Sequence, residues 1–451
     1  MTEPNSHPTW RPWRPLLTGE AARAANAAVD AIAAELAASP ESAKFRPPEG
    51  GGHFSLAGGQ AGIALFFAYL HFARPDEGHD ETAMAFLEQA IEGTGEIAVS
   101  AGLYSGFAGV AWTLEHLQGR LFDPDGEDPG EEIATALQGL LGRSPWQGDY
   151  DLISGLVGFG AYALERLPRP GGRECLEEIV SRLSELAESR ETGTPPATGI
   201  SWHTPPERVG ETQRELFPEG YYNLGVAHGV PGVIGLLGEV EAVGLAAAVT
   251  AEARRLREGA AAWVASQQLP AGANSLFPYS AAPGLTPTPS RLAWCYGDLG
   301  IAAAHLAAAR AARDPRLETE ALAVARHAAA RPAESAGVVD AGLCHGAAGV
   351  GHLFNRLYQA SGEAALRDAA RGWFERTLAL RGAEGIGGFR AWVPLDPDRT
   401  GELGWATDPG FLTGSAGIGL ALLAATTAVE PDWDRVLLTA IRGASGRQEE
   451  T

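Results

Sequence analysis

Seven copies of one pattern run through this chain of 451 residues, each a Gly-x-x-Gly pair followed by an apolar helical run. Successive copies are separated by 47, 49, 74, 68, 49 and 68 residues. The first glycines of the pairs are Gly59, Gly106, Gly155, Gly229, Gly297, Gly346 and Gly414. A unit that recurs at such intervals indicates a repeat architecture, in which each unit buries its apolar surface against its neighbours.

Each interval between glycine pairs also contains a second kind of helical segment. Segments such as "EAARAANAAVDAIAAEL" and "EAALRDAARGWFERTLAL" carry charge on one face and Ala or Leu on the other, which is typical of an outer layer. The runs that follow the glycines, such as "GGQAGIALFFAYL", are apolar nearly all round, which indicates buried helices. Because alternation of the β type is scarce, we expect an all-α fold. It should be an α/α toroid of seven inner and seven outer helices, with residues 1–19 as an N-terminal extension and 20–447 as one domain.

Composition narrows the classes of partner and compartment. The formal net charge of −22 argues against nucleic acid and anionic membranes, which select basic patches. The N-terminus lacks the apolar stretch of a signal peptide, and three cysteines without a secretion signal indicate a reducing, cytoplasmic setting. Three Pro/Gly-rich loops, 191–222, 270–290 and 383–410, are long enough to predict functional or mobile segments.

Alignment of the repeats on their first glycine brings reactive side chains to equivalent positions. Cys295 and Cys344 lie two residues before their glycines, and His228 and His345 lie one residue before theirs. In a closed ring these four side chains should meet at one end of the barrel. Two thiols and an imidazole suit zinc, and three protein ligands leave a fourth tetrahedral position open. Two cysteines that act as small apolar residues, or that form a disulfide, remain as alternatives, and Cys175 lies outside the register.

Other polar residues near the glycine pairs have two interpretations each. His228 has no cysteine beside it, so it is either a functional imidazole or a hydrogen-bonded packing residue. Asp151 lies four residues before its glycine, where an aspartate by default caps a helix. Arg291 lies six residues before its glycine and is either a site residue or a surface charge. Trp294 and Tyr296 flank a cysteine and are either cavity wall or plain packing.

Several of these stretches resemble the motifs of the lanthionine synthetase C-like family, which includes the lanthipeptide cyclases. "WCYGDLG" and "LCHGAAG" are similar to the two zinc-ligand motifs of that family. "YDLISGLVG", "WHTPPE", "FPEGYYNLGVAHGVPG" and "FLTGSAGIGLALL" extend the resemblance over about residues 20–445. The resemblance implies Zn²⁺ as cofactor. It assigns zinc ligation to Cys295, Cys344 and His345, and catalysis to His228, Asp151 and Arg291.

The reaction that the resemblance implies is thioether formation. A cysteine thiol of a dehydrated precursor peptide adds, in a Michael-type step, to dehydroalanine or dehydrobutyrine and gives a lanthionine or methyllanthionine ring. Bound zinc deprotonates the thiol. We expect His228 to protonate the α-carbon, Asp151 to orient it or to accept the thiol proton, and Arg291 to stabilise the enolate oxygen. The chain resembles the stand-alone cyclases of class I, whose implied partners are a lanthipeptide dehydratase and an exporter.

Three rival functions stay open at this point. An enzyme of the same shape would add glutathione or another thiol to dehydroamino acids. A non-catalytic, zinc-containing scaffold would only bind a peptide. A toroid glycosidase or terpene-type cyclase needs paired carboxylates or Asp-rich motifs at the cavity mouth, and Asp151 is the one carboxylate there with any register.

Overall fold

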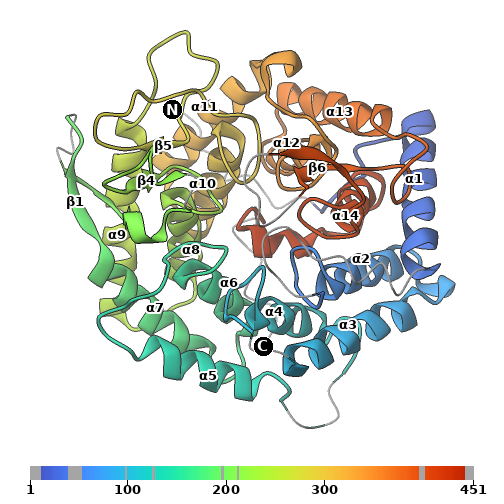
Figure 1. Ribbon diagram of the computed structural model, residues 1–451, viewed down its shortest axis with the longest axis horizontal. Coiled ribbons are helices and arrows are strands. Elements are labelled where there is room, and N and C mark those ends of the chain that lie inside the picture. The colour runs from blue at the N-terminus through green and yellow to red at the C-terminus, as the bar shows by residue number, and fades with distance from the viewer. Residues whose placement is uncertain are drawn as a thin grey trace, which may run out of the picture.

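The computed structural model describes residues 12–38, 53–96, 99–123, 126, 128–193, 198–210, 213–395 and 402–441. Within these residues fourteen α-helices alternate along the chain between an outer and an inner layer (Figure 1). Each inner helix packs on the next, and the last inner helix returns to the first, so that the ring is closed. The α/α toroid with seven inner and seven outer helices is therefore the observed fold.

Every inner helix begins directly after the first glycine of a repeat, as the register predicts. The inner helices are α2 (Gln60–Ala73), α4 (Phe107–Leu117), α6 (Leu156–Arg166), α8 (Val230–Ala242), α10 (Asp298–Ala312), α12 (Ala347–Ser361) and α14 (Ser415–Thr426). The outer helices are α1 (Gly19–Ala38), α3 (His79–Glu96), α5 (Glu131–Leu141), α7 (Gly172–Leu186), α9 (Ala247–Ser266), α11 (Pro315–Ala330) and α13 (Ala364–Ala379).

Burial separates the two layers as their sequence patterns require. Helix α14 is buried on all sides from Ser415 to Ala425, whereas α7 buries one stripe that includes Leu176, Ile179 and Leu183. Cys175 belongs to that stripe and is an ordinary buried residue of an outer helix. Among the helices that the structure describes, none combines the length and the apolar character needed to cross a bilayer.

The glycine pairs are explained by the loop that precedes each inner helix, because this loop lies flat on the first turn. A Cβ atom on the second glycine of a pair would lie 1.7–2.5 Å from the carbonyl oxygen six residues earlier, in all seven repeats. The first glycine of each pair is enclosed in the same way by backbone or side-chain atoms of the loop. Glycine is therefore required by close approach of backbones.

Backbone hydrogen bonds join the seven loops to one another at the end of the barrel where the inner helices begin. The donor–acceptor distances are 2.7–3.4 Å. The bonds run from Ala57 to Tyr104, Tyr104 to Ile153, Leu152 to Ala227, Ala227 to Cys295, Trp294 to Cys344, Cys344 to Leu412 and Leu412 back to Ala57. This closed circuit fixes the residues two positions before each glycine at one height.

The long loops contain short strands that the sequence analysis did not predict. They form three small antiparallel sheets, β1–β2, β3–β4–β5 and β6–β7. The strands are β1 (Glu188–Glu191), β2 (Thr198–Ser201), β3 (His203–Thr204), β4 (Tyr221–Asn223), β5 (Ser280–Ala281), β6 (Ala391–Pro394) and β7 (Leu403–Ala406). The 3₁₀ turn η3 (Pro206–Arg208) lies in the first long loop, and two more, η2 (Pro75–Glu77) and η5 (Ala333–Ser335), lie in other connections between helices. Two to four residues are too few for alternation to be visible in a sequence.

A C-terminal 3₁₀ segment, η6 (Asp432–Leu437), lies at the centre of the inner ring (Figure 1). Its Asp434 is fully buried and accepts hydrogen bonds from Arg356 and His352 of α12. The indole N–H of Trp294 donates to the carbonyl of Leu437 at 2.9 Å, so this segment supports the residue that precedes Cys295.

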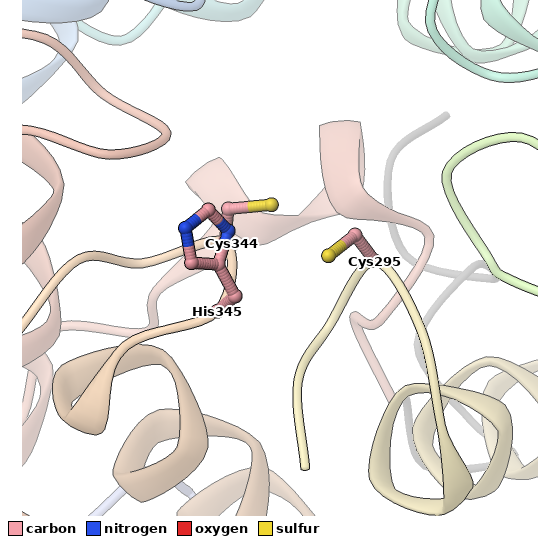
Figure 2. Close-up of side chains that lie close together, drawn as sticks. All are labelled: Cys295, Cys344 and His345. Atoms are coloured by element: carbon pink, nitrogen blue, oxygen red, sulfur yellow. The ribbon is translucent and has the colours of Figure 1, made fainter. Parts of the chain in front are cut away.

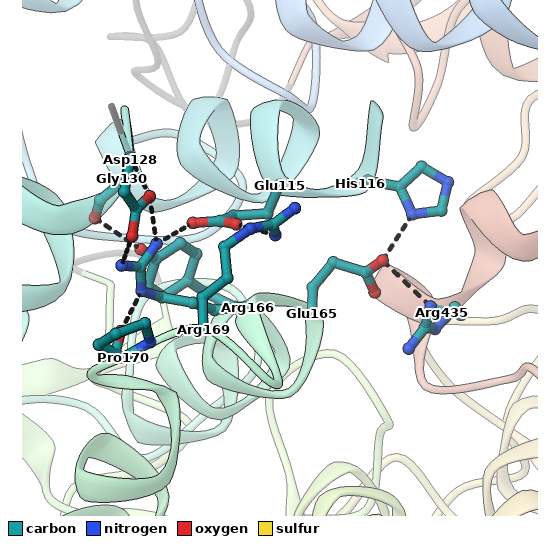
Figure 3. A network of polar contacts seen from close by, with 10 residues as sticks. Glu115, His116, Asp128, Gly130, Glu165, Arg166, Arg169, Pro170 and Arg435 are labelled. Atoms are coloured by element: carbon teal, nitrogen blue, oxygen red, sulfur yellow. Dashed lines mark hydrogen bonds and ion pairs between the residues drawn. The ribbon is translucent and has the colours of Figure 1, made fainter. Parts of the chain in front are cut away.

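Buried ion pairs join η6 to the ring as well. Figure 3 shows Glu165 of α6 between His116 of α4 (2.9 Å) and Arg435 of η6 (3.0 Å). In the same view the buried guanidinium of Arg166 pairs with Glu115 and with Asp128 (2.5 Å). These contacts satisfy charges that would be costly to bury alone, and they hold α4, α6 and the central segment in one arrangement.

Candidate metal centre

Cys295, Cys344 and His345 lie together at the rim of the inner barrel. Their sulfur and ring-nitrogen ligand atoms all lie within 4.8 Å of one another. Figure 2 shows both thiols directed into the space beside the imidazole. The group forms because the loops before α10 and α12 are neighbours in the backbone circuit, where the N–H of Trp294 donates to the carbonyl of Cys344 at 2.9 Å.

The electrostatics of the group favour a thiolate. The hydrogen bond from Cys344 holds the pKa of the Cys295 thiol well below its usual range, against the opposing effect of burial, and His345 and Arg291 lower it further. Burial alone would lower the pKa of His345, but the hydrogen bond with Cys295 and the negative charges of Cys295 and Asp340 together outweigh it, so that this pKa is raised. A thiolate is the form of cysteine that binds metals.

The residues present fit a divalent metal ion. Two thiolates and one imidazole are a donor set that suits zinc among biological metals. The Nδ1 atom of His345 is buried and finds no hydrogen-bond partner among the described residues. In the part of the chain that the structure describes, no fourth Cys, His, Asp or Glu joins the group. A bound ion would therefore keep one tetrahedral position for a ligand from outside. Cys295 and Cys344 are both thiols, so the disulfide alternative is not what the structure contains.

His228 and Asp151 form a pair in the same rim. The Nδ1 atom of His228 lies 2.6 Å from Oδ2 of Asp151, and the other carboxylate oxygen accepts the N–H of Ser154 at 2.8 Å. Asp151 therefore does not cap helix α6, whose N-cap is Gly155 with no side-chain cap hydrogen bond; its carboxylate closes a turn in the preceding loop and is the partner of the imidazole. A carboxylate on Nδ1 fixes the ring orientation and makes Nε2 the reactive nitrogen. The residue before His228 is tied to the metal group, since Ala227 donates its N–H to the carbonyl of Cys295 at 3.4 Å.

Arg291 lies between two pockets on this face. The first, of about 290 Å³, is lined by Arg291 together with Cys344 and His345. The second, of about 420 Å³, is lined by Arg291 together with Tyr221 and Tyr296. The Nε atom of Arg291 is buried without a hydrogen-bond partner among the described residues. Its guanidinium is therefore placed to meet a negatively charged or carbonyl oxygen of a ligand.

Two polar residues that were not predicted from the sequence also shape the site. Asn223 donates from Nδ2 to the hydroxyl of Tyr296 at 3.0 Å and so turns that ring toward the second pocket. Asp340 accepts the N–H of Gly342 at 3.1 Å, in the loop that carries Cys344 and His345. The sequence does contain a pattern from which Asn223 and Asp340 could have been predicted.

The pattern is a polar residue at the same position of several repeats. Asn223, Asp340 and Asp408 each lie six residues before a first glycine, and each accepts the backbone N–H two residues further on. Such turns are a local property of Asn and Asp. The structure therefore shows a recurring turn residue at the register position that Arg291 occupies in its own repeat.

Comparisons with known proteins add to this geometry. A family model described as lanthionine synthetase C-like protein matches residues 52–438. A solved structure of nisin cyclase is 20% identical, with a TM-score of 0.67, and the match covers 90% of this chain and 96% of that chain. This second likeness shows the fold alone. A polysaccharide lyase structure, 13% identical over 90% of this chain and 96% of that chain, has a TM-score of 0.42 and carries no argument. No curated protein sequence matches the chain.

Proposed function

Because the chain belongs to the lanthionine synthetase C-like family, we propose that it is a zinc-dependent lanthipeptide cyclase. Its substrate would be a dehydrated precursor peptide that contains cysteines. One observation carries the proposal: a group of two thiols and one imidazole, with no fourth donor among the residues that the structure describes, lies in the same rim as an imidazole held by a carboxylate. This combination suits a reaction that needs an activated sulfur and a positioned acid.

The proposed reaction adds a thiol across a carbon–carbon double bond. A bond forms between the sulfur of a peptide cysteine and the β-carbon of dehydroalanine or dehydrobutyrine, and the thiol proton is replaced by a proton delivered to the α-carbon. When bound by Cys295, Cys344 and His345, zinc would supply the acidification of the substrate thiol. No atom is gained or lost, so the ring closes without a change of mass.

The protein's own residues hold and move the proton in this scheme. Nε2 of His228 delivers a proton to the α-carbon, while Asp151 on Nδ1 keeps the ring in the required tautomer and orientation. Arg291 offers its guanidinium to the amide oxygen on which negative charge develops. A positioned general acid contributes roughly 10²–10⁴-fold in rate, and this range sets the expected loss on its removal.

A cyclisation assay with a dehydrated cysteine peptide tests the proposal. Ring closure leaves the mass unchanged and protects the cysteine from alkylation, so products are counted by mass spectrometry after a thiol-alkylating reagent is added. His228→Ala should retain the bound zinc and lose cyclisation by roughly 10²–10⁴-fold. His79→Ala, in an outer helix, is the matched control and should cyclise at the wild-type rate.

Three outcomes would contradict the proposal in different ways. Wild-type cyclisation by His228→Ala would reduce His228 to a packing residue. A zinc-loaded wild-type protein that binds peptide but leaves every cysteine open to alkylation would be a scaffold and not an enzyme. A mass increase in the presence of glutathione, with no ring closure, would assign the site to thiols from outside the peptide.

A further inference from the structure

The β6–β7 hairpin presents its bulky side chains on one face. Its register pairs Trp392 with Trp405 and Pro394 with Leu403, and paired residues and their neighbours at i±2 share a face of a sheet. The two indoles pack edge to face with ring centroids 5.3 Å apart. The other face carries small or buried residues such as Ala391, Val393 and Gly404. The large residues are therefore on the side that the core does not use.

This apolar face is exposed to solvent. Leu403 is 50% exposed and Trp405 40% exposed, and Val339, which lines the same pocket as Leu403, is exposed to a similar degree. Leu395 is exposed as well, but it lies over Gly404 on the other face. Leu403, Trp405 and Val339 are three of the seven large apolar side chains that the described residues leave open to water. A contiguous exposed apolar patch marks a site of interaction, because water-exposed apolar area is otherwise unfavourable. We refer to Trp392, Pro394, Leu403 and Trp405 as the hairpin face.

The hairpin face continues into the cavity of the metal centre. Trp392, Pro394 and Leu403 line the same pocket of about 290 Å³ as Cys344, His345 and Arg291. That volume lies at the small end of ligand pockets, which span about 300–1,000 Å³. It accommodates only a short piece of a peptide, so the residues next to that piece must lie outside the pocket, over the adjoining surface.

A buried carboxylate fixes the hairpin face relative to the metal donors. Asp340 accepts the N–H of Trp392 at 2.9 Å through one oxygen and the N–H of Gly342 at 3.1 Å through the other. Gly342 begins the loop that carries Cys344 and His345. One side chain thus ties the first strand of the hairpin to the donor loop, and an apolar group bound on the hairpin would be held in a constant position relative to the metal centre.

Resting on the function proposed above, we propose that the hairpin face binds apolar side chains next to the reacting cysteine of the peptide substrate. The protein would then prefer cysteines with apolar neighbours. The continuity of the face with the metal pocket favours this occupant. A second copy of the chain is disfavoured, because it would bring a net charge of −22 against a surface of the same protein.

Binding of two short peptides tests this preference without any need for cyclisation. The probes are acetylated and amidated pentapeptides, Gly-Leu-Cys-Leu-Gly and Gly-Ser-Cys-Ser-Gly, which contain no dehydro residue and so cannot react. Calorimetric titration into the zinc-loaded full-length protein should show tighter binding of the leucine peptide. Leu403→Ser and Trp405→Ser should each lower the affinity for the leucine peptide about five-fold, as expected for the loss of about half the burial of a large apolar side chain. The affinity for the serine peptide should stay unchanged.

Leu380→Ser is the matched control, since Leu380 is 42% exposed at the end of an outer helix and lies outside the hairpin. It should change neither peptide. Val339 lines the pocket but lies outside the hairpin, and Val339→Ser should lower the affinity for the leucine peptide and not for the serine peptide. This variant keeps the test valid if a hairpin variant misfolds.

The proposal is overturned if Leu403→Ser and Trp405→Ser, folded and zinc-loaded, bind the leucine peptide as the wild type does. It is equally overturned if these substitutions lower the affinities for both peptides to the same extent, or if sedimentation shows a wild-type dimer that Trp405→Ser dissociates. Failure of the cyclase proposal looks different, because the leucine preference would persist while the cyclisation assay showed no ring closure.

Discussion

Gly349, the second glycine of the repeat that carries Cys344 and His345, gives the sharpest prediction. A Cβ atom at this position would lie 1.7 Å from the carbonyl oxygen of Leu343, the shortest such approach among the seven second glycines. Leu343 immediately precedes Cys344 in the loop. Gly349→Ala therefore pushes on the metal-donor loop itself, while the helix that carries the substitution gains a better helix former.

The shift that the added methyl group forces on the Leu343 carbonyl can be compared with the deviation in ligand distance that a metal site tolerates. Since real Cβ contacts essentially never fall below 3.0 Å, the carbonyl must retreat from 1.7 Å by about 1.3 Å. Metal–ligand distances hold to about ±0.2 Å, so the shift exceeds that tolerance several-fold. Overpacking costs about 1–3 kcal/mol, partly offset by the roughly 1 kcal/mol that alanine gains over glycine in a helix. We expect the variant to fold, with modestly reduced stability, and to lose its metal.

Two measurements check this expectation. Metal content of the purified Gly349→Ala protein should be far below one equivalent, while circular dichroism retains the helical signal of the wild type. Gly372→Ala is the matched control, because Gly372 lies within outer helix α13 and a Cβ there meets nothing within 4 Å. That variant should keep its metal and gain about 0.5–1 kcal/mol in stability. Full metal retention by Gly349→Ala would refute the idea that the glycine pairs position the donors.

Two further predictions concern the inner barrel. Asp434→Asn removes the carboxylate between Arg356 and His352, and loss of one partner from a buried pair should lower the free energy of unfolding in urea by about 3–5 kcal/mol. Asp432 pairs with Arg120 at a more exposed position, so Asp432→Asn should lower it by under about 1 kcal/mol. Burial, and then Arg257, lower the pKa of His305 to about 3. The unfolded state therefore binds the proton first, and stability should fall by about 1.4 kcal/mol per pH unit as pH is lowered from ~6.5 to about 3. His305→Leu should lose this slope. Equal pH dependence of the two proteins would contradict this.

The fold follows from the sequence because the repeat imposes it. Seven copies of one unit, each with an apolar helix after a glycine pair, can bury their inner helices only by packing on one another, and closure of the ring leaves no end exposed. The register then predicts that Cys295, Cys344 and His345 are neighbours, as the structure has them. What the sequence could not supply is the backbone circuit, since hydrogen bonds between loops 47 or more residues apart leave no local pattern.

The short strands and the central 3₁₀ segment were not predicted from the sequence, and the physical reason is the same for both. Strands β6 and β7 are four residues each and owe their place to Asp340, a contact 52 positions away in the chain. The 3₁₀ segment η6 is held at the centre by ion pairs with α6 and α12, and its few apolar residues carry no repeat. In both cases tertiary contacts, and not local periodicity, decide the structure.

X-ray absorption at the zinc edge, with and without a cysteine peptide, shows whether three protein atoms hold the metal and leave one position open. Zinc held by Cys295, Cys344 and His345 should show two sulfur neighbours at about 2.3 Å together with nitrogen or oxygen neighbours at about 2.0–2.1 Å. Addition of an unreactive cysteine peptide should raise the sulfur count to three, because the open position accepts the substrate thiol. A site already filled by four protein atoms, or a sulfur count that the peptide leaves unchanged, would contradict the account.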